Sequence, residues 1–127
     1  MAAPAWLTAR PIAHRGFHGQ ADGALENTLG AVESAIERDF AVEVDLRLTA
    51  DGGLVVFHDG TLGRLTDRTD RVIDLPIDTL RTVDYRAGGE AIAGLDDLLA
   101  LVSGRVPLLL ELKSPGEHAL AERMVDA

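Results

Sequence analysis

The stretch AVEVDLRL, residues 41–48, constrains the fold of this chain more than any other segment, because apolar and polar side chains alternate along it without interruption. Side chains of a β-strand point to opposite faces with a period of two, so the pattern predicts a strand with one buried face and one polar face. Carboxylates two residues apart on the polar face are separated by ~7 Å along the strand. The buried face holds Val42, Val44, Leu46 and Leu48, and the polar face holds Glu43, Asp45 and Arg47.

The rest of the chain alternates between strand and helix patterns, which predicts an α/β fold with a largely parallel sheet. Asn27 is expected to cap the first helix at its N-terminus. Further strands are predicted at 11–14, 54–59 and 106–113, and helices at 28–38, 76–83, 95–102 and from 116 onward.

The connection between residues 48 and 54 is the exception to the parallel arrangement. It is far too short for a parallel crossover, and its Asp51-Gly52 pair favours a hairpin with a type I′ turn. A two-residue loop is preferred, because a three-residue loop would spoil the matching of apolar with apolar positions. The two-residue register places Leu48 opposite Val55, Leu46 opposite Phe57, and Asp45 opposite His58.

Composition limits the class of protein. A length of 127 residues predicts one domain, and a net charge of −9 disfavours nucleic acids and anionic membranes as partners. The absence of cysteine excludes disulfides and thiol chemistry and suits a reducing cytoplasm. The first residues lack the pattern of a signal peptide, and the most apolar run, VPLLLEL, is too short to span a bilayer. We therefore expect a cytoplasmic protein without stable membrane insertion.

Titratable residues recur at the ends of the predicted strands. His14 ends the first predicted strand and Arg15 follows it, and His58 and Asp59 end the third. Active sites of α/β barrels and open α/β sheets gather at the carboxyl ends of strands, so this distribution predicts a functional site. The strand at 106–113 is apolar enough to be buried on both faces, where Glu111 needs neutralisation by the nearby Lys113 or by a bound cation.

Five blocks of the sequence together resemble the glycerophosphodiester phosphodiesterases, within the phosphatidylinositol phospholipase C-like phosphodiesterase superfamily. The blocks are AHRG at 13–16, LENT at 25–28, VEVDLRLTADG at 42–52, VVFHD at 55–59 and LELK at 110–113. The resemblance covers residues 10–113 and implies a (β/α)8 barrel of the TIM type. Because such enzymes are about twice as long, residues 1–127 are expected to form the N-terminal half of the domain. A half-barrel would pair as a homodimer or with a missing C-terminal half.

The resemblance also implies a site and a reaction. A glycerol hydroxyl would attack phosphorus with release of the alcohol, and water would then open the cyclic phosphate to give glycerol 3-phosphate. Ligands that are all oxygen favour Mg²⁺ or Ca²⁺ over zinc, and histidine suits proton transfer at neutral pH. The implied metal ligands are Glu43, Asp45 and Glu111, the general acid and base are His14 and His58, and the groups that bind the small-molecule phosphodiester substrate are Arg15 and Lys113.

Several alternatives stay open at this point. Asp59 either orients His58 or caps a turn, and the Glu26-Asn27 pair is explained equally well by the family motif and by helix capping. A related phospholipase D-type or phosphoinositide-type phosphodiesterase, or a truncated non-catalytic domain that binds metal or phosphodiester, would carry similar blocks. His18 and His118 are expected on the surface, and Trp6 is expected to anchor packing.

Overall fold

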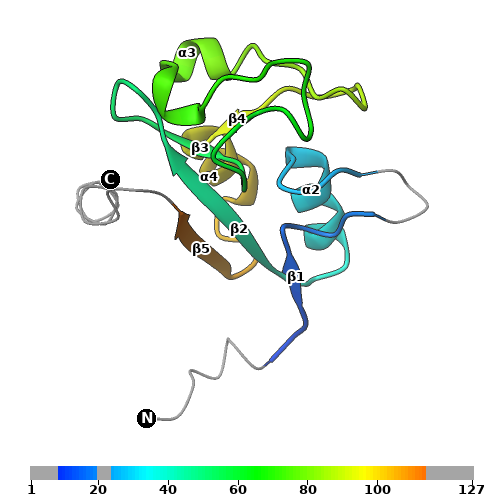
Figure 1. Ribbon diagram of the computed structural model, residues 1–127. Helices are drawn as coiled ribbons and strands as arrows, with labels where there is room; N and C mark the ends of the chain where they lie inside the picture. Colours follow the sequence, from blue (N-terminus) through cyan, green and yellow to red (C-terminus); the bar gives the residue numbers. More distant parts are fainter. Residues whose placement is uncertain (1–8, 20–23, 114–127) are drawn as a thin grey trace.

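The computed structural model describes residues 9–19 and 24–113, in which helices pack against a twisted sheet (Figure 1). The predicted helix from residue 116 onward lies outside the described residues, as do Trp6 and His118. No helix within the described residues is both long and apolar enough to cross a membrane. The strands are β1 (Ile12–His14), β2 (Ala41–Leu48), β3 (Leu54–Val56), β4 (Ala93–Gly94) and β5 (Leu108–Lys113), and the helices are α2 (Leu29–Glu37), α3 (Ile77–Leu80) and α4 (Leu95–Val102).

Strand β2 is the centre of the sheet. It pairs in parallel with β1 and with β5, and it pairs antiparallel with β3, which in turn pairs antiparallel with β4. Strand β5 runs beside residues 42–47, so β1 and β3 must follow one another along the opposite side of β2. The parallel β1–β2–β5 arrangement with packed helices confirms the predicted α/β class.

The predicted alternation in β2 is confirmed. Val42, Val44 and Leu46 are fully buried in a core that also contains Val32 of α2 and Leu98 of α4. The prediction that Asn27 caps the first helix is wrong. The N-cap of α2 is Thr28, whose side chain accepts a hydrogen bond from the Ala31 N–H. The polar face of β2 carries Glu43, Asp45 and Arg47.

The predicted register of the β2–β3 hairpin is wrong by one residue. Leu46 pairs with Val56 and Leu48 pairs with Leu54. The Thr49 N–H then donates to the Gly53 carbonyl at 2.9 Å, so the loop has three residues, 50–52, rather than two. Gly52 adopts a left-handed φ of 82°, as the third residue of such loops requires, and the Gly53 N–H donates to the Thr49 hydroxyl at 2.8 Å. A shift of one residue reverses the faces of β3, and the Phe57 N–H, not that of His58, donates to the Asp45 carbonyl.

Strand β3 ends at Val56 instead of residue 59, because the chain then leaves the sheet for the segment 57–92. This segment packs a second, smaller core in which the Phe57 and Tyr85 rings stack with centroids 6.2 Å apart. Within it, α3 ends at Leu80 instead of Val83. The two-residue strand β4, too short to leave a pattern in the sequence, returns the chain to β3 before α4 begins.

Candidate active site on the polar face of β2

The register of the parallel strands brings three carboxylates together. Asp45 of β2 pairs with Glu111 of β5, and Glu43 lies two residues before Asp45 on the same face. One carboxylate oxygen from each of the three lies within 4.8 Å of the others. We call Glu43, Asp45 and Glu111 the acidic cluster, and their predicted convergence is found in the structure.

The members of the acidic cluster differ in burial. Asp45 is completely buried, whereas the Glu111 side chain is 49% exposed at the edge of the described sheet. The prediction that Glu111 is buried on both sides of its strand is therefore wrong, although its predicted partner Lys113 does donate to it at 2.8 Å and lowers its pKa. Burial raises the pKa of Glu43, and the nearby charge of Asp45 raises it further. The Glu43 and Asp45 carboxylates therefore lie close together at low solvent exposure.

The residues of the acidic cluster fit a hard divalent cation. The Oε1 atom of Glu43 and the Oδ1 atom of Asp45 are buried, and neither has a hydrogen-bond partner among the described residues. A buried carboxylate oxygen without a partner is costly, and a bound cation would satisfy both atoms. Oxygen-only donors are those that Mg²⁺ and Ca²⁺ prefer.

The last residue of β1, His14, and the tight turn that follows it, with Arg15, lie beside the acidic cluster. The β1–β2 register pairs His14 with Glu43, and the His14 Nε2 atom lies 3.2 Å from the Glu43 Oε2 atom. Arg15 and Gly16 both have left-handed φ values, 59° and 78°, which bend the chain sharply. The Arg15 guanidinium consequently lies 3.4 Å from the Asp45 Oδ2 atom.

Two residues before α2 support this turn. The Asn27 N–H donates to the Arg15 carbonyl at 2.8 Å, and the Asn27 side chain is hydrogen-bonded to Asp45. The Glu26 Oε2 atom lies 3.1 Å from the Arg15 Nη1 atom. Of the two explanations left open for the Glu26-Asn27 pair, contact with the site is therefore the one that the geometry bears out.

His58 is held from two directions. Its Nδ1 atom lies 2.7 Å from the Asp59 Oδ1 atom, and its carbonyl accepts a hydrogen bond from the Arg47 Nε atom at 2.8 Å. Asp59 therefore contacts the His58 ring, the first of the two roles considered for it. Hydrogen bonds from Arg64, supplemented by the one with His58, lower the pKa of Asp59 to about 2, so this carboxyl is ionised at neutral pH. Among the described residues, the hydrogen-bond partner of the His58 ring is Asp59 and not a member of the acidic cluster.

Arg64 is a site residue that the sequence did not reveal. Its guanidinium donates to both carboxylate oxygens of Glu26, at 3.0 and 2.7 Å, and to both of Asp59, at 2.8 and 3.1 Å. It lies in an irregular segment, where side-chain periodicity gives no information. The signal that could have indicated it is the single arginine that follows the HD pair of the VVFHD block by five residues.

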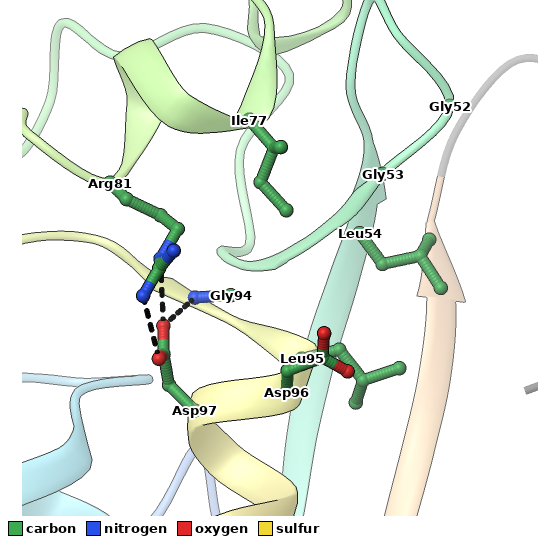
Figure 2. Close-up of a pocket in the computed structure, with 9 residues that line it drawn as sticks. All are labelled: Gly52, Gly53, Leu54, Ile77, Arg81, Gly94, Leu95, Asp96 and Asp97. Atoms are coloured by element: carbon green, nitrogen blue, oxygen red, sulfur yellow. Dashed lines mark hydrogen bonds and ion pairs between the residues drawn. The ribbon is translucent and has the colours of Figure 1, made fainter.

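A cavity of about 250 Å³ lies elsewhere, between the β2–β3 hairpin, α3 and the start of α4 (Figure 2). Its charged lining residues are Arg81, Asp96 and Asp97, of which Arg81 and Asp97 form an ion pair through two hydrogen bonds of 2.9 and 3.0 Å. Asp97 also accepts the Gly94 N–H at 2.8 Å. The Arg81–Asp97 pair fixes the start of α4 against the end of α3, which gives these two charged residues a structural role.

Comparison with known proteins identifies the family of this chain. The model of the glycerophosphoryl diester phosphodiesterase family matches residues 14–126. Glycerophosphodiester phosphodiesterase 1 of Bos taurus is 47% identical over 77 residues, which are 60% of this chain and 22% of that protein. A glycerophosphodiester phosphodiesterase of Caldanaerobacter subterraneus is 33% identical over 111 residues, which are 81% of this chain and 44% of that protein.

Solved structures show the same relationship. A phosphodiesterase of Oleispira antarctica, in complex with the product sn-glycerol-3-phosphate, matches with a TM-score of 0.82 at 32% identity, over 92% of this chain and 50% of that chain. The glycerophosphodiester phosphodiesterase of Agrobacterium tumefaciens matches with a TM-score of 0.74 at 32% identity, over 92% of this chain and 53% of that chain.

The chain thus spans about half of the length of these solved relatives, and less than half of the two curated ones. The likeness confirms the predicted fold class, an α/β barrel of which about half is present. Since the family model covers residues 14–126, the chain belongs to the glycerophosphoryl diester phosphodiesterase family.

Proposed function

We propose that this chain carries the metal and acid–base residues for hydrolysis of glycerophosphodiesters to glycerol 3-phosphate and an alcohol. The observation that carries the proposal is the convergence of three carboxylates within 4.8 Å, with His14 in contact with one of them. Membership of the family supports the substrate class. The phospholipase D-type and non-catalytic alternatives become outcomes of the experiment below.

The acidic cluster would hold one divalent cation, Mg²⁺ or Ca²⁺, through its carboxylate oxygens. When bound, such a cation supplies positive charge to the non-bridging phosphoryl oxygens and stabilises the charge that develops there in the transition state. Asn27 keeps the Asp45 carboxylate in one orientation for this purpose, because its amide donates to Oδ2 and leaves Oδ1 free among the described residues.

Arg15 and Lys113 would bind the phosphodiester itself. A guanidinium has five N–H donors, and the Arg15 contacts with Glu26 and Asp45 leave the others for non-bridging oxygens. Lys113 has three donors, of which one is bonded to Glu111. The positively charged side chains of Arg15 and Lys113 both lie beside the acidic cluster. An anionic substrate would therefore meet local positive charge on a chain whose net charge is −9.

His14 and His58 would move the protons of the two steps. Before the first step one histidine ring is neutral and the other is protonated. The neutral ring accepts the proton of the attacking glycerol hydroxyl, and the protonated ring donates a proton to the departing alcohol oxygen. In the second step the roles reverse, since water loses a proton to one ring and the ring-opened oxygen gains a proton from the other. Both histidines thereby return to their starting protonation, and each step balances in atoms and charge.

Four further points stay predictions drawn from the sequence: a cytoplasmic location, residues 1–127 as the N-terminal half of the domain, a small-molecule phosphodiester as the partner, and assembly as a homodimer or with a missing half. Light scattering during size-exclusion chromatography tests the last of these. A monomer would contradict the homodimer.

The test of the proposed function is release of glycerol 3-phosphate from glycerophosphocholine by the 127-residue chain, with Mg²⁺, with Ca²⁺ and with a chelator. We expect release that depends on the cation and falls by about 10²- to 10⁴-fold in His14→Ala and His58→Ala, the range typical of general acid–base groups. Glu37→Gln, which removes an exposed carboxylate of α2, is the matched control and should leave release unchanged.

Circular dichroism of the same samples shows whether each variant is folded. A folded chain that binds the cation without releasing glycerol 3-phosphate would overturn the proposal and favour the non-catalytic alternative. If the chain releases the head-group alcohol from an acylated phosphodiester but does not hydrolyse glycerophosphocholine, the phospholipase D-type alternative is favoured.

A further inference from the structure

We propose that Arg64 is a positioning residue that fixes both His58 and Arg15 by bridging the carboxylates that contact them. The inference rests on the proposed function for the roles of His58 and Arg15, but its geometry does not depend on that function. Arg64 lies in the segment 57–92, outside the strands that carry the acidic cluster. It therefore adds a second support to the site from a separate part of the chain.

On one side, Arg64 fixes the Asp59 carboxylate. Its Nε atom donates to Oδ2 at 2.8 Å and its Nη2 atom donates to Oδ1 at 3.1 Å. The Oδ1 atom is the one that lies 2.7 Å from His58 Nδ1. A carboxylate held in this way accepts the Nδ1–H of a neutral imidazole and leaves Nε2 as the atom that exchanges a proton with substrate.

On the other side, Arg64 fixes the Glu26 carboxylate. Its Nη1 atom donates to Oε1 at 3.0 Å and its Nη2 atom donates to Oε2 at 2.7 Å. The same Oε2 atom lies 3.1 Å from Arg15 Nη1, so two guanidinium groups share one nearly buried carboxylate. Without Arg64, the whole charge of Glu26 would act on Arg15 and compete with a phosphate for its donors.

An arginine is needed at this position because one planar group must meet two carboxylates at once. A guanidinium presents its donors in a fixed fork, whereas a lysine ammonium is a single point charge. The backbone of Arg64 is itself anchored, since Arg86 donates to the carbonyls of Gly63 and Arg64 at 3.0 and 3.2 Å. The backbone that carries the Arg64 side chain is therefore held in place by hydrogen bonds.

The test uses nuclear magnetic resonance of the full chain with ¹⁵N-labelled histidine, at a pH where His58 is neutral. We expect the Nδ1–H tautomer of His58 to predominate in the wild type and to lose its predominance in Arg64→Gln. In the glycerol 3-phosphate assay the same variant should lower kcat by about 10- to 100-fold, the usual cost of losing a group that orients a functional side chain, and should raise KM through Arg15. Arg68→Gln is the matched control, because Arg68 forms an exposed ion pair with Asp70 in the same segment.

Each outcome decides the matter. A folded Arg64→Gln chain that keeps the wild-type tautomer overturns the proposal, whatever its kinetics. A tautomer change in a chain that never releases glycerol 3-phosphate supports the positioning role and contradicts the proposed function instead. If Arg64→Gln does not fold, Arg64→Lys carries the same test, because it keeps the charge against both carboxylates and loses the double fork.

Discussion

The side chain of Asn27 and the residue Asp45 are hydrogen-bonded to each other twice. The Asn27 Nδ2 atom donates to the Asp45 Oδ2 atom at 3.0 Å, and the Asn27 Oδ1 atom accepts the Asp45 N–H at 3.2 Å. Asp45 is completely buried, and Asn27 adopts a left-handed φ of 57° to reach it. Asparagine tolerates that conformation better than most residues, so one side chain meets both the backbone and the site requirement.

Asn27→Ala should therefore lower the free energy of unfolding by about 3 kcal/mol, because buried hydrogen bonds to a charged group are lost and alanine is strained at this φ. Asn27→Gly loses the same hydrogen bonds without the strain and should lower it by about 1 kcal/mol less. Urea unfolding of the two variants measures both values. Equal values for alanine and glycine would contradict the strain, and wild-type stability in both would contradict the hydrogen bonds.

The turn after β1 gives a second prediction. A methyl group at Gly16 would lie 2.8 Å from the Ala31 Cβ atom of α2, in addition to the strain of a φ of 78°. Gly16→Ala should therefore destabilise the chain by at least about 1 kcal/mol more than strain alone, since overpacking of a closed contact costs about 1–3 kcal/mol.

Gly19→Ala is the matched control for this prediction. Gly19 also has a left-handed φ, 69°, but none of the residues that the structure describes lies within 4 Å of an added methyl group, so backbone strain is the cost that we expect there. Thermal unfolding of both variants compares them. Equal losses would show that the turn does not pack against α2 as described.

The alternation of β2 made most of the acidic cluster predictable, because a period of two puts Glu43 and Asp45 on one face wherever the neighbouring strands lie. The partners on that face were not predictable in the same way. Arg64 and Asp59 both lie in the segment 57–92 and are hydrogen-bonded to each other. The path of this segment depends on tertiary packing around Phe57 rather than on a local pattern.

The errors in the predicted fold also arise from features that depend on tertiary structure. Val55 and Val56 are both buried, on opposite faces of β3, so the apolar run carried no information on register and the loop chemistry of Thr49 and Gly52 decided it. The exposure of Glu111 follows from its place at the edge of the described sheet, which depends on the arrangement of strands and not on the composition of the strand.

The lowered pKa of Asp59 gives a pH prediction. The carboxyl titrates near 3.8 when unfolded and at about 2 when folded, so the folded state binds its proton less readily. Its contribution to stability is then complete above about pH 4 and is lost as the pH falls from about 4 to about 2. Because Arg64 is 45% exposed, solvent screening limits the contribution to between about 1 and 2 kcal/mol.

Urea unfolding at pH 2, 3, 4 and 7 measures this effect as the difference between the wild type and Asp59→Asn. Subtraction cancels the other carboxylates that titrate in the same range. The difference should be constant from pH 4 to 7 and should shrink toward pH 2. A difference that does not change over this interval would show that Asp59 is not held ionised by Arg64.

Charge repulsion within the acidic cluster gives a prediction for the chain without metal. Glu43→Gln should raise the free energy of unfolding in the presence of a chelator by about 1 kcal/mol, because one of two close, poorly solvated negative charges is removed. In the exposed control Glu37→Gln we expect no change. Destabilisation by Glu43→Gln in chelator would contradict the repulsion on which the cation site depends.

The most direct measurement of the central claim is calorimetric titration of the chain with Mg²⁺ and with Ca²⁺. We predict saturable binding of one cation per chain, retained in Glu37→Gln and abolished or weakened at least about 10-fold in Glu43→Gln, Asp45→Asn and Glu111→Gln alike, since the three carboxylates share one ion. Binding that survives all three substitutions, or no saturable binding to the folded wild-type chain, would contradict the account.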